Sequence, residues 1–187
     1  MKEEELLVKK AQEGNAEAFG KLYDLYMPRI YRFIFLKVGT RQDAEDLAQQ
    51  VFVNAWQHLE GFEFRGFPFA SWLYRIASNA VIDFYRTSRP SADLEKIPDE
   101  FVAQTASTER DLDHAFDMAT VKVALAKLDA EHQNVLILRF VDDLSTKEIA
   151  KVLEKSEGAV RVIQHRALKI LKTHIDGRQT DSTIKEA

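Results

Sequence analysis

Hydrophobic residues recur along most of this chain with the period of an α-helix, and the clearest repeat lies between Arg41 and Glu60. Positions three and four residues apart share one face of a helix, so this spacing predicts a single buried stripe. The stripe consists of Ala44, Leu47, Ala48, Val51, Phe52, Ala55, Trp56 and Leu59. The opposite face carries Asp43, Asp46, Gln49, Gln50, Asn54 and Gln57. Most such faces are only solvated surface, but this one is acidic, rich in amides and poor in lysine, which also suits a protein partner.

Similar spacing predicts helices on both sides of this segment. Upstream, one helix covers residues 4–26 with a break at Gly14, and a second starts at Pro28 and ends at Gly39. Downstream, residues 71–86 are expected to be helical. The buried side of that helix is predicted to hold Leu73, Ile76, Ala77, Ala80, Val81 and Phe84.

The segment from Ser88 to Arg110 differs in kind, because it has two prolines, many small polar residues and few apolar ones. That composition predicts a flexible linker rather than a packed element. Helical periodicity resumes near Asp111, and Asp129 is placed to cap a second helix. The inward positions expected there are Phe116, Ala119, Val123, Ala124, Leu128, Val135, Leu136, Leu138 and Phe140.

Two more helices follow, joined by a short turn. Ser145 and Glu148 have the spacing of a capping box, which starts a short helix, and Ser156 is placed to cap a longer one from Glu157 to Ile175. A short helix, a tight turn and a longer basic helix form a helix-turn-helix. The longer helix is predicted to bury Val160, Ile163, Ala167, Ile170 and Leu171. Its other side carries Arg161, His165, Lys169 and Lys172, with Val162 and Arg166 on the flank.

These elements predict an all-α protein of two small helical domains joined by a flexible acidic linker, the second with a helix-turn-helix. We place the N-terminal domain at 1–89, the linker at 90–111, the C-terminal domain at 112–176 and a disordered tail at 177–187. The length of 187 residues suits such a division, and the hydrophobic content of 45% supports packed cores.

Composition limits where the protein works. The chain has no cysteine, which excludes disulfides and thiolate metal sites and fits a reducing cytoplasm. Its first residues are acidic and mixed, unlike a signal peptide. No apolar run approaches the roughly 20 residues of a membrane span. We therefore expect a cytoplasmic protein without membrane insertion.

The net charge of −4 hides an uneven distribution. Residues 62–89 hold four basic and two acidic side chains, and residues 145–175 hold seven basic and three acidic ones. Between them, residues 91–117 hold eight acidic and two basic side chains. Two basic blocks separated by an acidic connector indicate two contacts with nucleic acid.

Residues 62–89 also combine many aromatic side chains with arginines. The aromatic members are Phe62, Phe64, Phe67, Phe69, Trp72, Tyr74, Phe84 and Tyr85, and the basic ones are Arg65, Arg75, Arg86 and Arg89. Aromatic faces beside guanidinium groups can stack unpaired bases and hold their phosphates, whereas the alternative is an aromatic core with solvated arginines. Gly66 and Pro68 predict a loop at 62–69. Arg75 and Asn79, one helical turn apart, can both donate to base edges.

Several kinds of chemistry find no support in the sequence. The five histidines are dispersed without the spacing of a metal site, and the common phosphate-binding and nucleophile motifs are missing. A nuclease with acidic ligands at Asp43, Glu45 and Asp46 would need a partner cluster that the neighbouring sequence does not supply. We therefore expect no enzymatic activity, no cofactor and no metal.

Three sequence blocks carry a resemblance to a known family: DAEDLAQQVFVNAW, FRGFPFASWLYRIASNAVIDFYR and LSTKEIAKVLEKSEGAVRVIQHRALKIL. In this order and spacing they resemble the bacterial sigma factors of the extracytoplasmic-function type, group IV of the sigma-70 family. The likeness covers residues 5–90 and 112–175. One departure lies after the turn, where the family often has Lys or Arg, then Ser and Arg, and this chain has Arg161, Val162 and Ile163. The −35 sequence that it reads is therefore left open.

The resemblance implies a promoter-specificity subunit of RNA polymerase that recognises −35 and −10 elements and helps to melt DNA. The N-terminal domain would be sigma region 2 and the C-terminal domain sigma region 4. The implied contacts with core polymerase are Asp46, Gln49 and Gln50. Those with the single-stranded −10 element are Phe64, Arg65, Phe67, Phe69, Arg75 and Asn79. Those with the −35 element are Arg161, Val162, His165, Arg166 and Lys169.

The implied partners are core RNA polymerase, through the clamp helices and flap of its large subunits, promoter DNA and an anti-sigma factor. The acidic linker would run through the basic RNA exit channel of the polymerase. A net charge of −4 suits this arrangement, because the polymerase would supply affinity that the free chain lacks. A stand-alone helix-turn-helix transcription regulator is the alternative, and tight binding to duplex DNA without polymerase would favour it.

Overall fold

The first helical group contains α1–α4 and a short 3-10 helix. The computed structural model describes residues 2–38, 40–64, 68–88 and 121–185. In the first group α1 spans Lys2–Gln12, α2 Ala16–Phe35, α3 Arg41–His58, η1 Leu59–Gly61 and α4 Phe69–Ser88. The side chains of Asn15 and Thr40 accept hydrogen bonds from the backbone N–H groups of Ala18 and Asp43, and so cap α2 and α3. The periodicity predicted for α3 is confirmed.

The path of the chain around Pro28 differs from the prediction. The break expected at Gly14 is present, and this glycine has φ of 88°, in the left-handed region. However, α2 continues through Pro28, so no new helix begins there. A proline inside a helix removes one backbone hydrogen bond. Tyr26 and Ile30, two residues before and two residues after this proline, are buried, and packing of α2 on α3 and α4 offsets that loss.

The second helical group contains a helical segment at 121–126 and α6–α8. Here α6 spans Ala130–Phe140, α7 Thr146–Val152 and α8 Glu157–Lys185. The Asp129 side chain caps α6 by accepting from the His132 N–H, and the capping box of Ser145 and Glu148 is complete. These predicted helix starts are therefore confirmed.

The end of α8 corrects the predicted boundary at Ile175, because the helix continues to Lys185. It thus includes most of the segment expected to be a disordered tail at 177–187. Gly177 lies within this stretch, and a single glycine inside a helix costs only about 1 kcal/mol, which does not force an end. Helical backbone past Ile175 is consistent with the lack of proline in this stretch.

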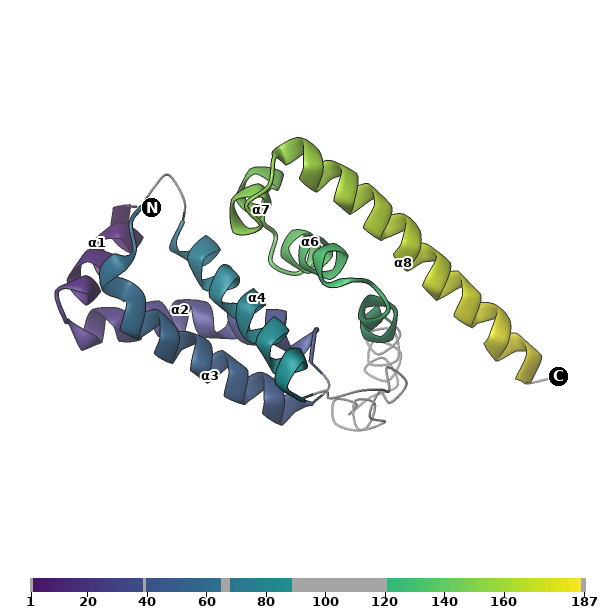
Figure 1. Cartoon of the computed structure of the whole chain (residues 1–187), viewed down its shortest axis with the longest axis horizontal. Helices are drawn as coiled ribbons and strands as arrows, with labels where there is room; N and C mark the ends of the chain where they lie inside the picture. Colours follow the sequence, from purple (N-terminus) through teal and green to yellow (C-terminus); the bar gives the residue numbers. More distant parts are fainter. Residues whose placement is uncertain (1, 39, 65–67, 89–120, 186–187) are drawn as a thin grey trace.

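The two helical groups lie side by side, with α4 packed on α7 (Figure 1). Buried residues of both groups, including Phe33, Leu73, Val135 and Ile149, form one continuous apolar cluster. A smaller cluster within the second group consists of Leu125, Leu128, Leu136 and Ala167. All described elements are helical, which confirms the predicted fold class. The predicted linker at 90–111 lies outside the described residues.

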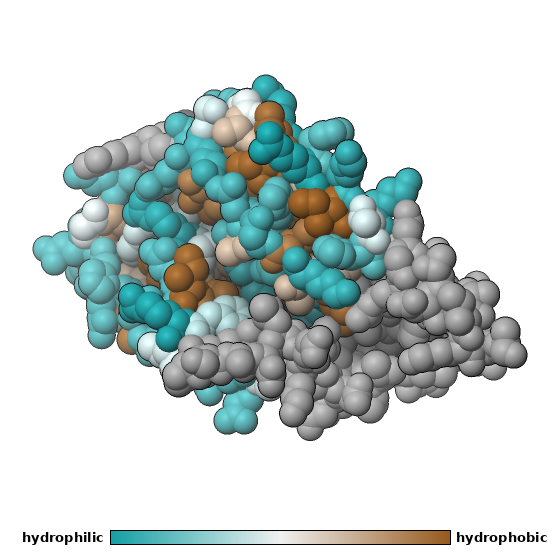
Figure 2. All heavy atoms as spheres, turned by 45° about the vertical axis from the view of Figure 1, so that its right-hand side comes forward, coloured by the Kyte–Doolittle hydropathy of each residue, from teal (hydrophilic) through white to brown (hydrophobic). Residues whose placement is uncertain are grey.

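The surface drawn in Figure 2 is mostly hydrophilic, and its hydrophobic side chains gather in several separate groups. On α8 the exposed apolar residues are Val162, Leu168 and Ile170. Ile170 was expected to be buried, and its 38% exposure corrects that expectation. The buried stripe of α8 is narrower and consists of Val160, Ile163 and Ala167, because among the described helices α8 packs mainly against α6 and α7. Among the described helices, none is long and apolar enough to cross a membrane.

Candidate nucleic-acid interface

The helix-turn-helix is built from α7, a four-residue turn at 153–156 and the start of α8. Ile149 and Val160 are both fully buried, so the two helices share one apolar seam. Glu154 in the turn has φ of 54°, a left-handed conformation that is more often taken by glycine. The Ser156 hydroxyl accepts a hydrogen bond from the Ala159 N–H at 3.1 Å and begins α8. The geometry is that of a recognition helix held by a short support helix.

Every residue predicted to contact a −35 element is exposed on α8. These residues are Arg161, Val162, His165, Arg166 and Lys169. They lie away from the buried stripe, so the helix packs on one side and presents a largely basic surface on the other. The Arg161 guanidinium forms an ion pair with Glu157 one turn earlier, at 3.1 Å. Both side chains are well exposed, so this pair is weak and the arginine can exchange it for DNA.

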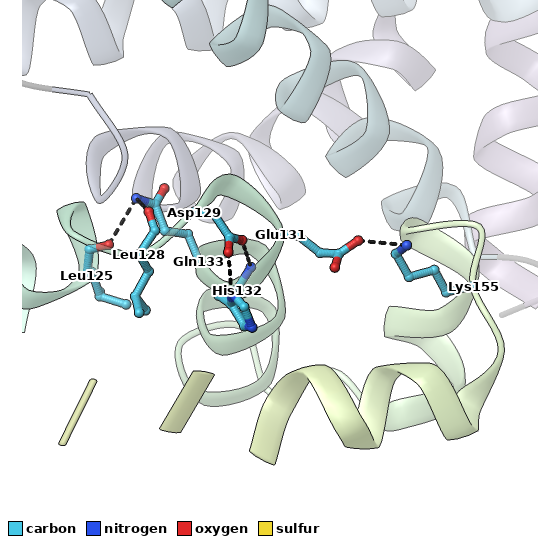
Figure 3. A network of polar contacts seen from close by, with 7 residues as sticks. All are labelled: Leu125, Leu128, Asp129, Glu131, His132, Gln133 and Lys155. Carbon is cyan, nitrogen blue, oxygen red and sulfur yellow. Dashed lines mark hydrogen bonds and ion pairs between the residues drawn. The ribbon is translucent and has the colours of Figure 1, made fainter. Parts of the chain in front are cut away.

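A polar network fixes the turn of this motif to the rest of the second group (Figure 3). The Lys155 ammonium in the turn pairs with the Glu131 carboxylate of α6 at 2.6 Å. The Gln133 amide donates to the carbonyl oxygens of Leu125 and Leu128 at 2.9 and 3.0 Å. These contacts connect the 121–126 segment, α6 and the turn before α8 in one framework. The orientation of α8 is thus set from two sides.

An aromatic cluster occupies the start of α4 in the first group. The Phe62 ring lies 4.9 Å from Phe64, 5.3 Å from Phe69 and 5.1 Å from Trp72. Phe69 is fully buried, whereas Phe64 and Trp72 are half-buried. Phe69 therefore supports the cluster in this structure, and exposed ring surface comes from Phe64 and Trp72. Two other predicted contacts, Arg65 and Phe67, lie outside the described residues.

Arg75 and Asn79 project from the exposed side of α4. A cleft of about 600 Å³ runs beside Trp72 and Arg75, and α7 and the following turn form its other wall. The Arg75 guanidinium pairs across the groups with the Glu154 carboxylate at 2.7 Å. The structure therefore brings Trp72 and Arg75 together along one cleft, with Asn79 one turn further along α4.

The face of α3 predicted to meet a protein partner is exposed at Asp46, Gln49 and Gln50. Val53 and Trp56 are also exposed on this helix, by 48% and 40%. Trp56 was expected in the buried stripe, but it lies at its edge, where its ring packs on Phe19 at 4.8 Å. Helical spacing could identify the stripe but not its width, because the width depends on how α2 covers α3.

Charged groups are buried where the two helical groups meet, and no sequence pattern pointed to them. The Lys37 ammonium contacts the Asn134 side-chain oxygen and lies 4.9 Å from the centre of the Phe33 ring. Burial lowers the pKa of Lys37 to about 8. The Arg29 guanidinium donates to the Asp142 carbonyl oxygen at 2.8 Å. Burial raises the pKa of the Asp142 carboxyl to about 6, against the opposing effects of Tyr74, Arg29 and Arg32.

Comparison with known protein families assigns each helical group to a region of the sigma-70 family. Residues 22–90 match the family model of sigma-70 region 2, and residues 124–173 match that of sigma-70 region 4. These ranges contain α3, α4 and the helix-turn-helix. They thus contain every residue singled out above for contact with polymerase or DNA.

Individual relatives are similar over most of the chain. It is 35% identical to the ECF RNA polymerase sigma factor BldN of Streptomyces coelicolor over 176 residues, which are 88% of this chain and 63% of that protein. It is 31% identical to the ECF RNA polymerase sigma factor SigX of Bacillus subtilis, covering 86% of this chain and 84% of SigX. The solved structure of CnrH in complex with the cytosolic domain of CnrY superposes with a TM-score of 0.73 at 27% identity, covering 94% of this chain and 98% of CnrH.

Proposed function

Because this chain belongs to the extracytoplasmic-function family of RNA polymerase sigma factors, we propose which of its residues bind the −35 element, the −10 element and core polymerase. A sigma factor is not an enzyme but recognises promoters together with RNA polymerase. One observation carries the proposal: a single chain exposes a basic recognition helix in one helical group and Arg75 with Asn79, beside half-buried aromatic rings, in the other. These are surfaces for duplex and for unpaired DNA.

In this proposal α8 enters the major groove of the −35 element. Its first exposed turns carry Arg161, Val162, His165 and Arg166, and Lys169 follows one turn later. Residues near the N-terminus of a recognition helix reach base edges, and arginine can bind guanine with two hydrogen bonds. Arg161 is therefore the best placed base reader, and Lys169 is placed for the phosphate backbone.

The −10 strand is taken up in the first group. Exposed ring surface of Phe64 can stack an unpaired base, with Arg75 and Asn79 as hydrogen-bond donors behind it, and we assign Arg65 and Phe67 to the same site from their sequence positions. Stacking on an aromatic ring contributes roughly 1–3 kcal/mol per base. A melted base pair loses about 1.4 kcal/mol of stacking per step, so a few captured bases offset local opening. Phe69 contributes as buried support.

We assign the exposed face of α3 to core polymerase, where it meets the clamp helices of the large subunit. Asp46, Gln49 and Gln50 supply the polar part, and Val53 with Trp56 supply an apolar centre next to them. A large aromatic side chain surrounded by polar groups is the usual composition of an energetically important interface site. The second group would contact the polymerase flap, and the acidic linker would pass through its RNA exit channel.

A regulatory protein that binds this chain is also part of the proposal. CnrH was solved bound to the cytosolic domain of CnrY, so a protein of this fold can be held by another protein. We propose that an anti-sigma factor binds this chain. A cytoplasmic location follows from partners of this kind, because polymerase and promoter DNA are found there.

The test is reconstitution with purified bacterial core RNA polymerase. We expect the chain to co-elute with core in size-exclusion chromatography and to direct transcription from a subset of a genomic promoter pool. Aligning the transcript start sites would give the −10 and −35 sequences. Failure to bind core from several bacterial phyla would overturn the proposal. Tight, specific binding to duplex DNA by the free chain would instead indicate a stand-alone regulator.

A further inference from the structure

Helix α1 reaches the two described ends of the predicted aromatic loop, residues 62–64 on one side and Pro68 with Phe69 on the other, although it precedes residue 22, where the match to sigma-70 region 2 begins. The ends of this loop lie together, because the Phe62 and Phe69 rings meet at 5.3 Å. Two polar side chains of α1, Glu4 and Gln12, bind the backbone on opposite sides of the loop.

At the far end of the loop, Glu4 caps α4. The Phe69 N–H donates to the Glu4 carboxylate at 2.9 Å. The residue before Phe69 is Pro68, whose side chain has no acceptor and therefore cannot cap the helix itself. A carboxylate at this position also interacts favourably with the positive end of the helix dipole. A residue from the start of the chain thus supplies a cap that the local sequence lacks.

At the near end, Gln12 holds the backbone that leads into the loop. Its side-chain amide donates to the carbonyl oxygens of Leu59 and Phe62 at 3.0 and 2.7 Å. Leu59 begins η1 and Phe62 follows its last residue, so one side chain spans the whole turn. Both carbonyls would otherwise lack part of their hydrogen bonding at the end of a helix.

We propose that Glu4 and Gln12 are positioning residues for capture of the −10 single strand. They fix the two described ends of the loop, and thereby the spacing between Phe64 and the donors of α4. This inference rests on the proposed function, and it makes α1 a determinant of promoter opening rather than only of stability. Neither residue contacts DNA in this scheme.

The experiment measures three affinities of wild type and variants: for core polymerase, for a −35 duplex, and, as holoenzyme, for a single-stranded oligonucleotide carrying the −10 sequence. Both DNA sequences are those recovered from the promoter pool. The variants are Glu4→Ala, Glu4→Gln and Gln12→Met, and Glu3→Ala is the matched control. Glu3 is exposed in the same turn of α1, so its loss removes an equal charge without touching the loop.

We expect Glu4→Ala and Gln12→Met to lower the affinity for the −10 strand about fivefold, the factor that corresponds to a typical helix cap. Core and −35 affinities should stay within twofold of wild type, and Glu3→Ala should behave as wild type. Glu4→Gln keeps an oxygen that can accept from the Phe69 N–H, so it should recover most of the loss.

Two results would overturn the inference. In the first, Glu4→Ala and Gln12→Met bind the −10 strand as Glu3→Ala does. In the second, all three affinities fall together, which is the signature of lost stability. If Glu4→Ala does not fold, Gln12→Met decides alone, because it leaves the α4 cap intact. A wild-type holoenzyme that ignores the −10 strand would refute the proposed function itself, which separates the two failures.

Discussion

Exposure separates residues that can touch DNA from those that support them. Phe69 and Arg75 lie less than two helical turns apart on α4, yet the phenylalanine has no exposed surface and the arginine projects into the cleft. The group of aromatic residues that the sequence predicted to contact DNA therefore has two layers. Its inner layer of Phe62 and Phe69 is core, and its outer layer of Phe64 and Trp72 offers ring surface to a base.

The role of Asn79 can be tested by its loss. Asn79→Ala removes an exposed amide of α4, so it should not change the packing of the first group. We expect promoter opening, followed by the fluorescence of 2-aminopurine in the −10 element, to slow about tenfold, as loss of one specific base contact does. Core affinity should be unchanged. An equal slowing in Asp83→Ala, one turn along the same helix, would show that loss of any exposed polar side chain on this face, rather than of the Asn79 amide, slows opening.

Arg161 provides the corresponding test on duplex DNA. If it reads a base, Arg161→Ala should weaken −35 binding by about 1–3 kcal/mol and relax the preference at one base pair. Lys172→Ala removes the same charge further along α8 and should weaken all sequences alike. Competition binding with single-base variants of the −35 duplex distinguishes the two. An unchanged preference profile in Arg161→Ala would contradict its assignment as a base reader.

Local signals predicted the helices well, because helix starts and buried stripes are written in neighbouring residues. Asp129 and Ser145 each cap the helix expected from their position. The errors concern features that depend on other parts of the chain. The width of the α3 stripe at Trp56 depends on α2, and the narrow stripe of α8 depends on how far α6 and α7 reach.

Long-range polar contacts had no sequence signal at all. Glu4 meets the backbone of Phe69, and Arg75 meets Glu154, although these partners are distant in the chain and no motif pairs them. Such pairs depend on tertiary packing, whereas helical periodicity reports only on neighbours within one element. The predicted site residues could therefore be named from the sequence. The residues that position them, or that form ion pairs with them, could not.

The exposed face of α3 can be tested as one element. Trp56→Ala removes the largest apolar side chain of this face and should weaken core binding by about 2 kcal/mol, as loss of a central aromatic does at many interfaces. Because the ring also packs on Phe19, thermal stability must be followed in parallel. Trp56→Phe should retain most of the affinity, and Gln57→Ala, exposed next to it, should change little. Equal losses in Trp56→Ala and Gln57→Ala would contradict an apolar centre.

In the whole molecule the two helical groups pack against each other in a closed form, whereas the two promoter elements that they would bind are far apart on DNA. Their positions at −35 and −10 place them about 25 base pairs, or roughly 80 Å, apart along the duplex. The two helical groups instead share one apolar cluster, and Glu154 of the second group forms an ion pair with Arg75 of the first. We therefore expect the groups to separate when the chain binds polymerase and DNA.

Protonation should bias this separation, because Asp142 is buried between the groups. Tyr74 from α4 and Arg29 and Arg32 from α2 face its carboxyl group, yet burial prevails and raises its pKa to about 6 from the ordinary value of 3.8. A raised pKa means that the closed form binds the proton more tightly. The contact is thus favoured below this range and weakens as pH rises through about 6.

Lys37 lies at the same contact, but its effect on the closed form has the opposite dependence on pH. Burial lowers its pKa to about 8 from 10.5, with the Phe33 ring and Asn134 as its neighbours. The closed form therefore favours the neutral amine, and its contribution is lost as pH falls through about 8. Near neutral pH both groups are charged, so the contact between the helical groups is weakest there.

Energy transfer between two dyes can measure this equilibrium, and the lack of cysteine makes specific labelling straightforward. Cysteines at Gln57 in α3 and Lys172 in α8 would report the distance between the groups. Lowering the pH from 7 to 5 should raise the ratio of closed to open molecules about tenfold, the factor that a shift of this size gives. Asp142→Asn keeps the shape without the charge and should remove most of that dependence. If its slope between pH 7 and 5 equals that of the wild type, histidines rather than Asp142 control the contact.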